Sequence, residues 1–231
     1  MRLFSLTLTI IAIAGVACAQ VKFDSYARLI TDDEAAHLDL FYDELRNHPN
    51  TRGYLVGYND SSIPPGVFLR RLYGDQAYLT ELRGLEPSRI SVLEGGYRDK
   101  LTFEMWVAPI NSPAPPLTPK RNVSAPTRRL LFDEECLECA PAVFLDLPGL
   151  GAGLKFYAAA LRNAANVRAL IVVRPGQETS SAQALADARR AKRKLVRQHG
   201  IASRRIGIRL ARRRKDNMAT AEMWVIPRSA K

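Results

Sequence analysis

The tetrapeptide Glu104-Met105-Trp106-Val107 occurs again as Glu222-Met223-Trp224-Val225, 118 residues further along the 231-residue chain. Upstream of it, other matches occur at a constant separation of 116 residues, which places a two-residue insertion in the second copy. They pair Leu45-Arg46-Asn47 with Leu161-Arg162-Asn163, Arg52 with Arg168, Gly84 with Gly200, and Arg89-Ile90 with Arg205-Ile206. Only two copies occur, and the period exceeds solenoid lengths, so the chain contains a duplicated domain.

Each copy has the same order of expected elements. Apolar residues spaced i, i+3, i+7 predict one helix in each copy, through Leu38, Phe41 and Leu45 and through Leu154, Tyr157 and Leu161. A buried strand (53–56 and 169–173), a second helix (65–82 and 181–199) and two closing strands follow. Short strands at 21–26 and 143–147 are expected before the first helices. The pattern β-α-β-α-β-β predicts an α/β sandwich, with two helices on a small mixed sheet in each repeat.

Local signals mark the ends of these helices. Thr31 with Glu34 and Ser180 with Gln183 have the spacing of helix-capping pairs. Gly84 and Gly200 fit the left-handed position after a helix end. The expected closing strands span 89–93 and 101–107 in the first copy, and 205–210 and 220–226 in the second.

The chain divides into four segments. Arg2, an apolar run and Ala17-Cys18-Ala19 are typical of a secretory signal peptide cleaved after Ala19. A lipidated Cys18 is the alternative. The first repeat then spans 20–110, a proline-rich linker 111–135 and the second repeat 136–231. The sequence therefore predicts a periplasmic or secreted protein with no membrane-spanning segment after cleavage.

Charge is distributed unevenly between the two copies. The whole chain has 34 Lys and Arg against 23 Asp and Glu, a formal net charge of +11. Residues 151–231 contain 19 basic and 4 acidic side chains, so the basic excess lies in the second copy. This asymmetry indicates that one half has an anionic partner.

The first copy resembles the OmpA-like, peptidoglycan-associated domain. The resemblance lies in Lys22-Phe23-Asp24-Ser25, in 38–50, in Gly57-Tyr58-Asn59-Asp60 and in 78–90. It implies that Asp60 and Arg71 bind the diaminopimelate of peptidoglycan. Charge-assisted hydrogen bonds from such a pair suit a zwitterionic group. Asn59, which precedes Asp60, is the third expected ligand-binding residue. In the second copy Arg190-Ala191 matches the family's helix motif, but Arg174-Pro175-Gly176-Gln177 replaces the Asp signature.

The second copy's long helix carries a basic face. Like charges at i and i+4 repel in an isolated helix, and Asp187 is the only acidic residue in this one. The face is therefore expected to meet solvent, an external anion, or acidic residues of the first copy such as Asp32, Asp33, Asp39 and Asp43. The candidate anion-binding residues are Arg189, Arg190, Arg193, Lys194, Arg197, Arg212, Arg213 and Arg214. Anionic lipid or polymer phosphates are the expected partners, and nucleic acid is disfavoured for an exported chain.

Cys136 and Cys139 form a CxxC motif. Structural zinc would need further Cys or His ligands at a suitable spacing, and none is present. In an oxidising compartment the motif favours a small disulfide loop. A thiol–disulfide protein is the alternative interpretation.

These features together favour a non-enzymatic cell-envelope protein without cofactor or metal. We expect it to attach to peptidoglycan or another anionic envelope component. The other hypothesis from the duplicated fold is a protein-interaction module that has lost the ligand site.

Overall fold

The computed structural model describes residues 20–27, 31–122, 124, 126–139, 153–213 and 218–228. The expected signal peptide and the expected strand at 143–147 therefore lie outside the described residues. Among the helices of the described ranges, none combines the length and apolar composition needed to cross a bilayer.

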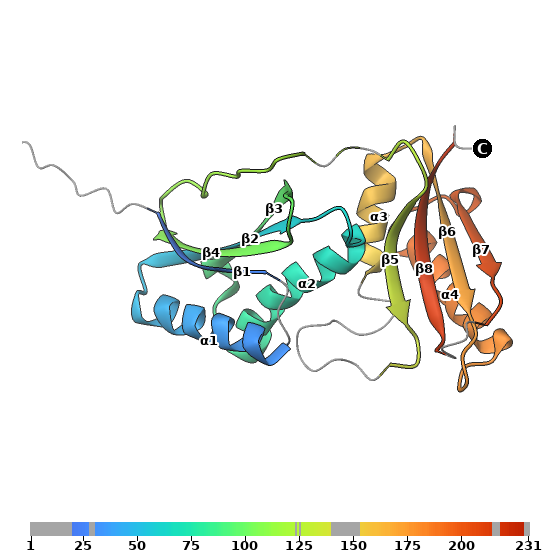
Figure 1. Cartoon of the computed structure of the whole chain (residues 1–231), viewed down its shortest axis with the longest axis horizontal. Coiled ribbons are helices and arrows are strands. Elements are labelled where there is room, and N and C mark those ends of the chain that lie inside the picture. Colours follow the sequence, from blue (N-terminus) through green and yellow to red (C-terminus); the bar gives the residue numbers. More distant parts are fainter. Residues whose placement is uncertain are drawn as a thin grey trace, which may run out of the picture.

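The two halves have the same architecture, as the repeat predicted (Figure 1). The first half contains β1 (Val21–Tyr26), α1 (Thr31–Asn47), β2 (Thr51–Asn59), α2 (Pro65–Ala77), β3 (Ile90–Tyr97) and β4 (Thr102–Pro109). The second contains β5 (Leu130–Cys136), α3 (Leu154–Asn163), β6 (Val167–Arg174), α4 (Ser181–Arg197), β7 (Ile206–Leu210) and β8 (Thr220–Pro227). The described residues also contain short helices at Tyr78–Leu82, Pro87–Arg89 and Ser203–Arg205.

Each sheet is mixed and has four strands. The strand orders are β1-β4-β2-β3 and β5-β8-β6-β7, with β2 parallel to β3 and β6 parallel to β7. The repeated tetrapeptides occupy the antiparallel strands β4 and β8. Met105 and Met223 point into the helix-covered core and are fully buried. On the opposite face each indole N–H donates to the preceding glutamate, Trp106 to Glu104 and Trp224 to Glu222. The repeated tetrapeptide therefore has the alternation expected of a strand, with Met facing the helix-covered core and Glu and Trp facing the other side of the sheet.

The predicted caps at Gly84, Gly200 and Ser180 are present. Gly84 and Gly200 adopt φ values of 75° and 70° after their helices, and the Ser180 hydroxyl accepts a hydrogen bond from the Gln183 N–H. Arg89 and its equivalent Arg205 donate to carbonyls at the ends of α1 and α3, including those of Leu45 and Leu161. These arginines satisfy carbonyl groups that a helix end leaves without intrahelical partners.

The first strand of the second half lies earlier than expected. β5 begins at Leu130, within the segment 111–135 that the prolines suggested was linker. Phe132-Asp133 in β5 corresponds to Phe23-Asp24 in β1, and a bulge occurs in each strand at this phenylalanine. Their separation is 109 residues rather than 116, so this pair departs from the constant spacing of the repeat.

The proline-rich segment packs against the first half. It covers the sheet face opposite α1 and α2, where Tyr54, Val56 and Tyr58 form a small cluster. The Thr118 N–H donates to the Tyr58 hydroxyl, and Tyr97 pairs with Arg121. In Figure 1 the segment crosses above the first sheet before it reaches β5.

The two halves are joined at α2. This helix packs against β5 and α3, and Figure 1 places it between the first sheet and the second half. Arg70 of α2 donates to both carboxylate oxygens of Asp133, at 3.2 and 2.9 Å, and to the Glu134 carbonyl. The Arg70 side chain is 9% exposed and that of Asp133 is 0% exposed. A Cβ at Gly66 or Gly153 would lie within 2.8 Å of an Asp133 side-chain atom, so both glycines make room for this carboxylate.

We predict that Arg70→Met destabilises the protein by about 3–5 kcal/mol, because it removes the guanidinium that pairs with the buried Asp133 carboxylate. The double variant Arg70→Met/Asp133→Asn should recover part of this loss, since it also removes the buried negative charge. Urea unfolding of both, with the exposed Arg46→Met as control, measures the difference. A loss below about 1 kcal/mol for Arg70→Met would contradict a structural role for the pair.

Candidate functional site

Backbone N–H groups from the turn after β2 and from the residue before β4 surround the carboxylate of Asp60. Asp60 Oδ1 accepts from the Ser62 N–H at 2.6 Å and the Ile63 N–H at 3.2 Å, and the Ser62 hydroxyl also donates to it. The Leu101 N–H is a further donor to this carboxylate. We call the N–H groups of Ser62, Ile63 and Leu101 the first nest. Desolvation acts in the opposite direction, but these hydrogen bonds hold the pKa of Asp60 below its ordinary value.

The second copy repeats this arrangement with a carboxylate from elsewhere in the chain. Glu138 Oε1 accepts from the N–H groups of Glu178 and Thr179, at 2.9 and 2.6 Å, and Oε2 accepts from the Ala219 N–H at 3.0 Å. We call these three donors the second nest. They are the repeat equivalents of Ser62, Ile63 and Leu101, at separations of 116, 116 and 118 residues.

Gly176 explains how the second nest accommodates its carboxylate. A Cβ there would lie 2.2 Å from both Glu138 carboxylate oxygens. The sequence Arg174-Pro175-Gly176-Gln177, which replaces the Asp signature, therefore leaves space for Glu138. Desolvation opposes the effect, but the backbone donors lower the pKa of Glu138. Both turns thus bind an anion, and in both the anion belongs to the chain.

The CxxC motif positions Glu138. Cys136 and Cys139 are joined by a disulfide with a Cα–Cα distance of 5.4 Å, and the Cys139 N–H lies 3.0 Å from Cys136 Sγ. Glu138 lies in this small loop. The disulfide thus constrains the segment that carries the carboxylate into the second nest.

Arg71 has a different environment from Asp60. Its guanidinium donates to both carboxylate oxygens of Glu34 of α1, at 2.7 and 2.8 Å. Burial acts in the opposite direction, but Glu34 raises the pKa of Arg71. Asp60 accepts hydrogen bonds from backbone N–H groups, whereas Arg71 pairs with Glu34 of α1 and lies over the Phe103 ring of β4, so these contacts of the two side chains are with different partners.

A buried acidic group lies beside Arg71. Asp75 is 0% exposed, and its Oδ2 accepts from the Tyr26 hydroxyl at 2.8 Å, whereas its Oδ1 has no hydrogen-bond partner. Burial, with the charge of Glu34, raises the pKa of Asp75 well above its ordinary value, against the opposing effects of Tyr26 and Arg71. Ala191 is the repeat equivalent of Asp75, and Ala184 and Ala188 replace Phe68 and Leu72. The first copy therefore contains an ionisable cluster where the second has alanines.

Asn59, the third residue of the expected ligand site, is 3% exposed. Its Nδ2 donates to the Ile63 carbonyl at 3.1 Å, and its Oδ1 is buried without a hydrogen-bond partner. It lines a cavity of about 390 Å³ between the two halves. Of the three residues of the ligand site that the resemblance implied, the described lining of this cavity includes Asn59 but neither Asp60 nor Arg71.

The basic face of α4 is present on the surface. Ala184, Ala188, Ala191 and Leu195 are buried, and α4 packs on β6 and β7. The five candidate residues of this helix are exposed, and we call them the α4 basic face: Arg189, Arg190, Arg193, Lys194 and Arg197. Three of them, with Lys192, line a shallow groove of about 290 Å³.

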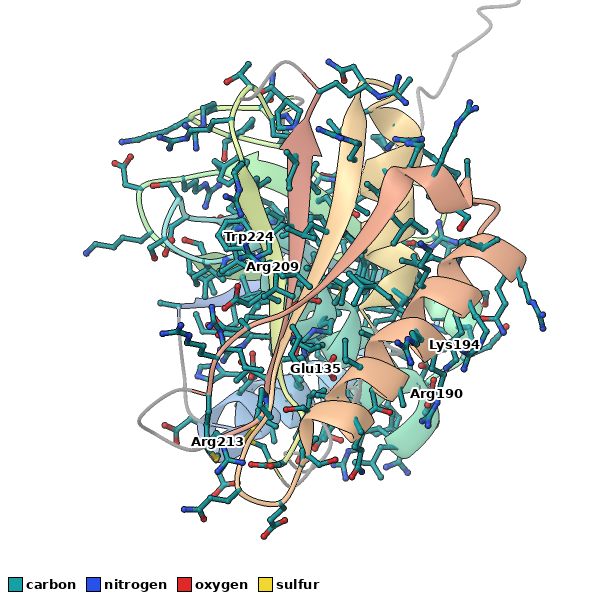
Figure 2. All side chains as sticks on the ribbon, turned by 90° about the vertical axis from the view of Figure 1, so that its right-hand side faces the viewer. Glu135, Arg190, Lys194, Arg209, Arg213 and Trp224 are labelled. Atoms are coloured by element: carbon teal, nitrogen blue, oxygen red, sulfur yellow. A yellow bond between two sulfur atoms is a disulfide. The ribbon has the colours of Figure 1, made fainter. Side chains whose placement is uncertain are left out.

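The other candidate cations do not extend this face. Figure 2 shows Arg190 and Lys194 on α4, and Arg213 after β7 at a distance from them. Arg212 and Arg213 are exposed, and Arg214 lies outside the described residues. Docking of this face against the acidic residues of α1 is wrong, because α1 and α4 lie at opposite ends of the molecule in Figure 1.

Three features of the site had weak or no sequence signals. Arg70 is adjacent to Arg71, and nothing local distinguishes the arginine that joins the halves. The repeated Phe-Asp pair would have indicated Asp133. The role of Glu138 depends on contacts with residues 40 and 81 positions away in the chain.

The described residues contain no cluster of three or more His, Cys, Asp or Glu side chains arranged for a metal ion.

We predict that Asp75 makes stability decrease with rising pH. Its folded-state pKa is raised, so its contribution is fully present below the unfolded value of about 3.9 and is lost as the pH rises through the folded value. Compared with Asp75→Asn, the wild type should therefore become less stable as the pH increases. Urea unfolding at several pH values measures this difference, and a constant difference would contradict the prediction.

For the two nests we predict the opposite dependence. The folded-state pKa values of Asp60 and Glu138 are lowered, so their contributions are present above the unfolded values of about 3.9 and 4.3 and are lost as the pH falls through the folded values. The stability advantage of the wild type over Asp60→Asn and over Glu138→Gln should decrease below about pH 4. Unfolding curves in acid, compared with those at pH 7, test this. An advantage that persists unchanged in acid would argue against anionic occupants.

Comparison with known proteins identifies no family. No family model and no curated protein matches the chain. A solved chorismatase structure is similar to it with a TM-score of 0.28 and 12% sequence identity, over 90% of this chain and 73% of that one. A similarity at this level carries no argument about function.

Proposed function

We propose that this chain is a non-catalytic binding protein of the bacterial cell envelope, which attaches through the α4 basic face to a component that carries phosphate or carboxylate groups. The observation that carries the proposal is the set of five exposed cations on one side of a helix whose other side is buried. Such a surface attracts polyanions, and the attraction weakens with salt.

The electrostatics of α4 support an external partner. Asp187 is 3.4 Å from Arg190, and it is the only acidic side chain in the helix. Arg189, Arg193 and Arg197 lie one turn apart along the groove, where they repel each other. A bound anion would relieve this repulsion and bridge successive turns of the helix.

The groove favours several weak contacts over one deep pocket. It is shallow, and its cations come from α4, with Ser203 at one side. Long flexible side chains of this kind adapt to a repeating polymer or to the headgroups of a lipid surface. The expected ligand is therefore extended and multivalent.

Asp60 is a weaker candidate than the α4 basic face for contact with peptidoglycan. Its carboxylate already accepts hydrogen bonds from the first nest. Glu138 likewise fills the second nest from within the disulfide loop, which favours a structural role for Cys136 and Cys139 over thiol–disulfide exchange.

We predict that neutralising Arg189, Arg193 and Arg197 to Gln weakens binding to phosphatidylglycerol vesicles by roughly 100-fold, at about 1 kcal/mol for each cation near an anionic surface. Vesicle co-sedimentation at low and physiological salt measures this. Neutralising the exposed Arg46, Lys100 and Arg128 removes the same charge elsewhere and is the matched control.

A second arm uses purified peptidoglycan with the same variants and with Asp60→Ala. Loss of binding in the α4 variant alone supports the proposal and identifies a polymer ligand. Loss in Asp60→Ala alone, or equal losses in the α4 variant and its control, would contradict it.

A further inference from the structure

The cavity between the two halves is built from elements of both. Asn59 lies at the end of β2, Phe68 and Leu69 in α2, Tyr97 at the end of β3, Phe132 in β5 and Phe156 in α3. Its volume of about 390 Å³ falls within the range of small-molecule sites, which occur preferentially at domain interfaces.

Its position in the fold also suits a ligand. β2 and β3 are parallel, and Asn59 pairs with Tyr97 at their carboxyl ends. In α/β sheets, ligands bind beyond the carboxyl ends of the strands. Pro65, at the start of α2, lines the cavity together with Asn59 and Tyr97.

The walls are mainly apolar. Three phenylalanines line it, Phe68, Phe132 and Phe156, together with leucines, prolines and alanines. Phe156 is fixed by Tyr73, with ring centroids 5.0 Å apart, and Phe132 by Tyr157 at 5.4 Å. The aromatic walls are therefore held in place by neighbours, and they favour a flat, apolar ligand.

One wall residue lacks a hydrogen-bond partner. Asn59 is 3% exposed and uses its amide N–H on the Ile63 carbonyl, whereas its Oδ1 accepts no hydrogen bond. A buried acceptor without a donor is costly, and a ligand with an N–H or O–H group would remove that cost.

The charge of the lining selects against anions. Glu94 is the one acidic residue among the described lining residues, and these include no Lys, Arg or His. The cavity therefore disfavours negatively charged ligands, whereas the α4 basic face favours them. A carboxylate or phosphate would meet a negative charge and no cation.

We propose that this inter-repeat cavity is a binding site for a small, neutral, largely aromatic molecule that donates one hydrogen bond to Asn59. The site requires both copies, because its walls come from α2 and β2 of the first and from α3 and β5 of the second. The Arg70–Asp133 ion pair, next to Leu69 and Phe132 in the sequence, holds these walls together.

The test uses N-phenyl-1-naphthylamine, a neutral aromatic probe with one N–H group, whose fluorescence increases in an apolar site. We expect saturable binding to the full chain. Ala160→Trp places an indole in the cavity and should weaken binding at least tenfold, whereas Ala186→Trp, at an exposed position of α4, should leave it unchanged.

Two further probes of the same framework test the chemistry. 1-Phenoxynaphthalene lacks the N–H group and should compete about fivefold to tenfold less well, as expected for one hydrogen bond. The anionic 8-sulfonate of the first probe should compete poorly with it, and Glu94→Gln should improve that competition roughly fivefold.

Methyl NMR shifts of the wild type provide a measurement that needs no variant. Addition of N-phenyl-1-naphthylamine should shift the methyl signals of Leu69, Leu130 and Val225, which line the cavity. Shifts confined to other methyl groups, absence of probe binding, or equal affinity of Ala160→Trp and Ala186→Trp would each overturn the proposal.

Discussion

The buried ion pair between Arg70 and Asp133 determines how the two halves of this protein fit together. It joins a helix of the first half to a strand of the second, and both side chains are almost completely removed from solvent. Such a pair contributes little net stability compared with apolar packing, but either member alone would be strongly unfavourable. The interface is therefore restricted to arrangements that bring the two charges together. Gly66 and Gly153, which have no side chain to collide with Asp133, serve the same arrangement. Leu69 and Phe132, which precede Arg70 and Asp133 in the sequence, line the cavity between the halves.

The duplicated halves have kept their backbone interactions and changed their side chains. In each half, two N–H groups of a turn and one N–H group from the residue before the last strand surround a carboxylate. Asp60 supplies this carboxylate locally in the first half, and Glu138 supplies it from the disulfide loop in the second. Inside the sheet–helix layer, Asp75 of the first half faces Glu34, Arg71 and Tyr26, whereas the second half has Ala191 at this position. The same backbone geometry therefore accommodates an ionisable cluster in the first copy and buried alanines in the second.

Two surfaces with opposite charge preferences result from this divergence. The α4 basic face has exposed cations on the side of the helix opposite a buried strip of alanines and Leu195. The inter-repeat cavity is lined by phenylalanines and contains one negative charge. An anionic polymer and a neutral aromatic molecule would therefore bind to different parts of the chain without competing.

The sequence by itself determined the duplication, the order of the elements and most of their ends. Those signals are local: apolar spacing along a helix, alternation along a strand, and glycine or serine at a helix end. The strand β5 was missed because Phe132-Asp133 departs from the constant repeat spacing and follows a run of prolines. Only the tertiary structure decided that Arg70 rather than Arg71 joins the halves, that Glu138 fills the second nest, and that Asn59 lines a cavity. Each of these depends on contacts between elements far apart in the chain, such as the 63 residues between Arg70 and Asp133. Local periodicity contains no information about which distant side chains a fold brings together.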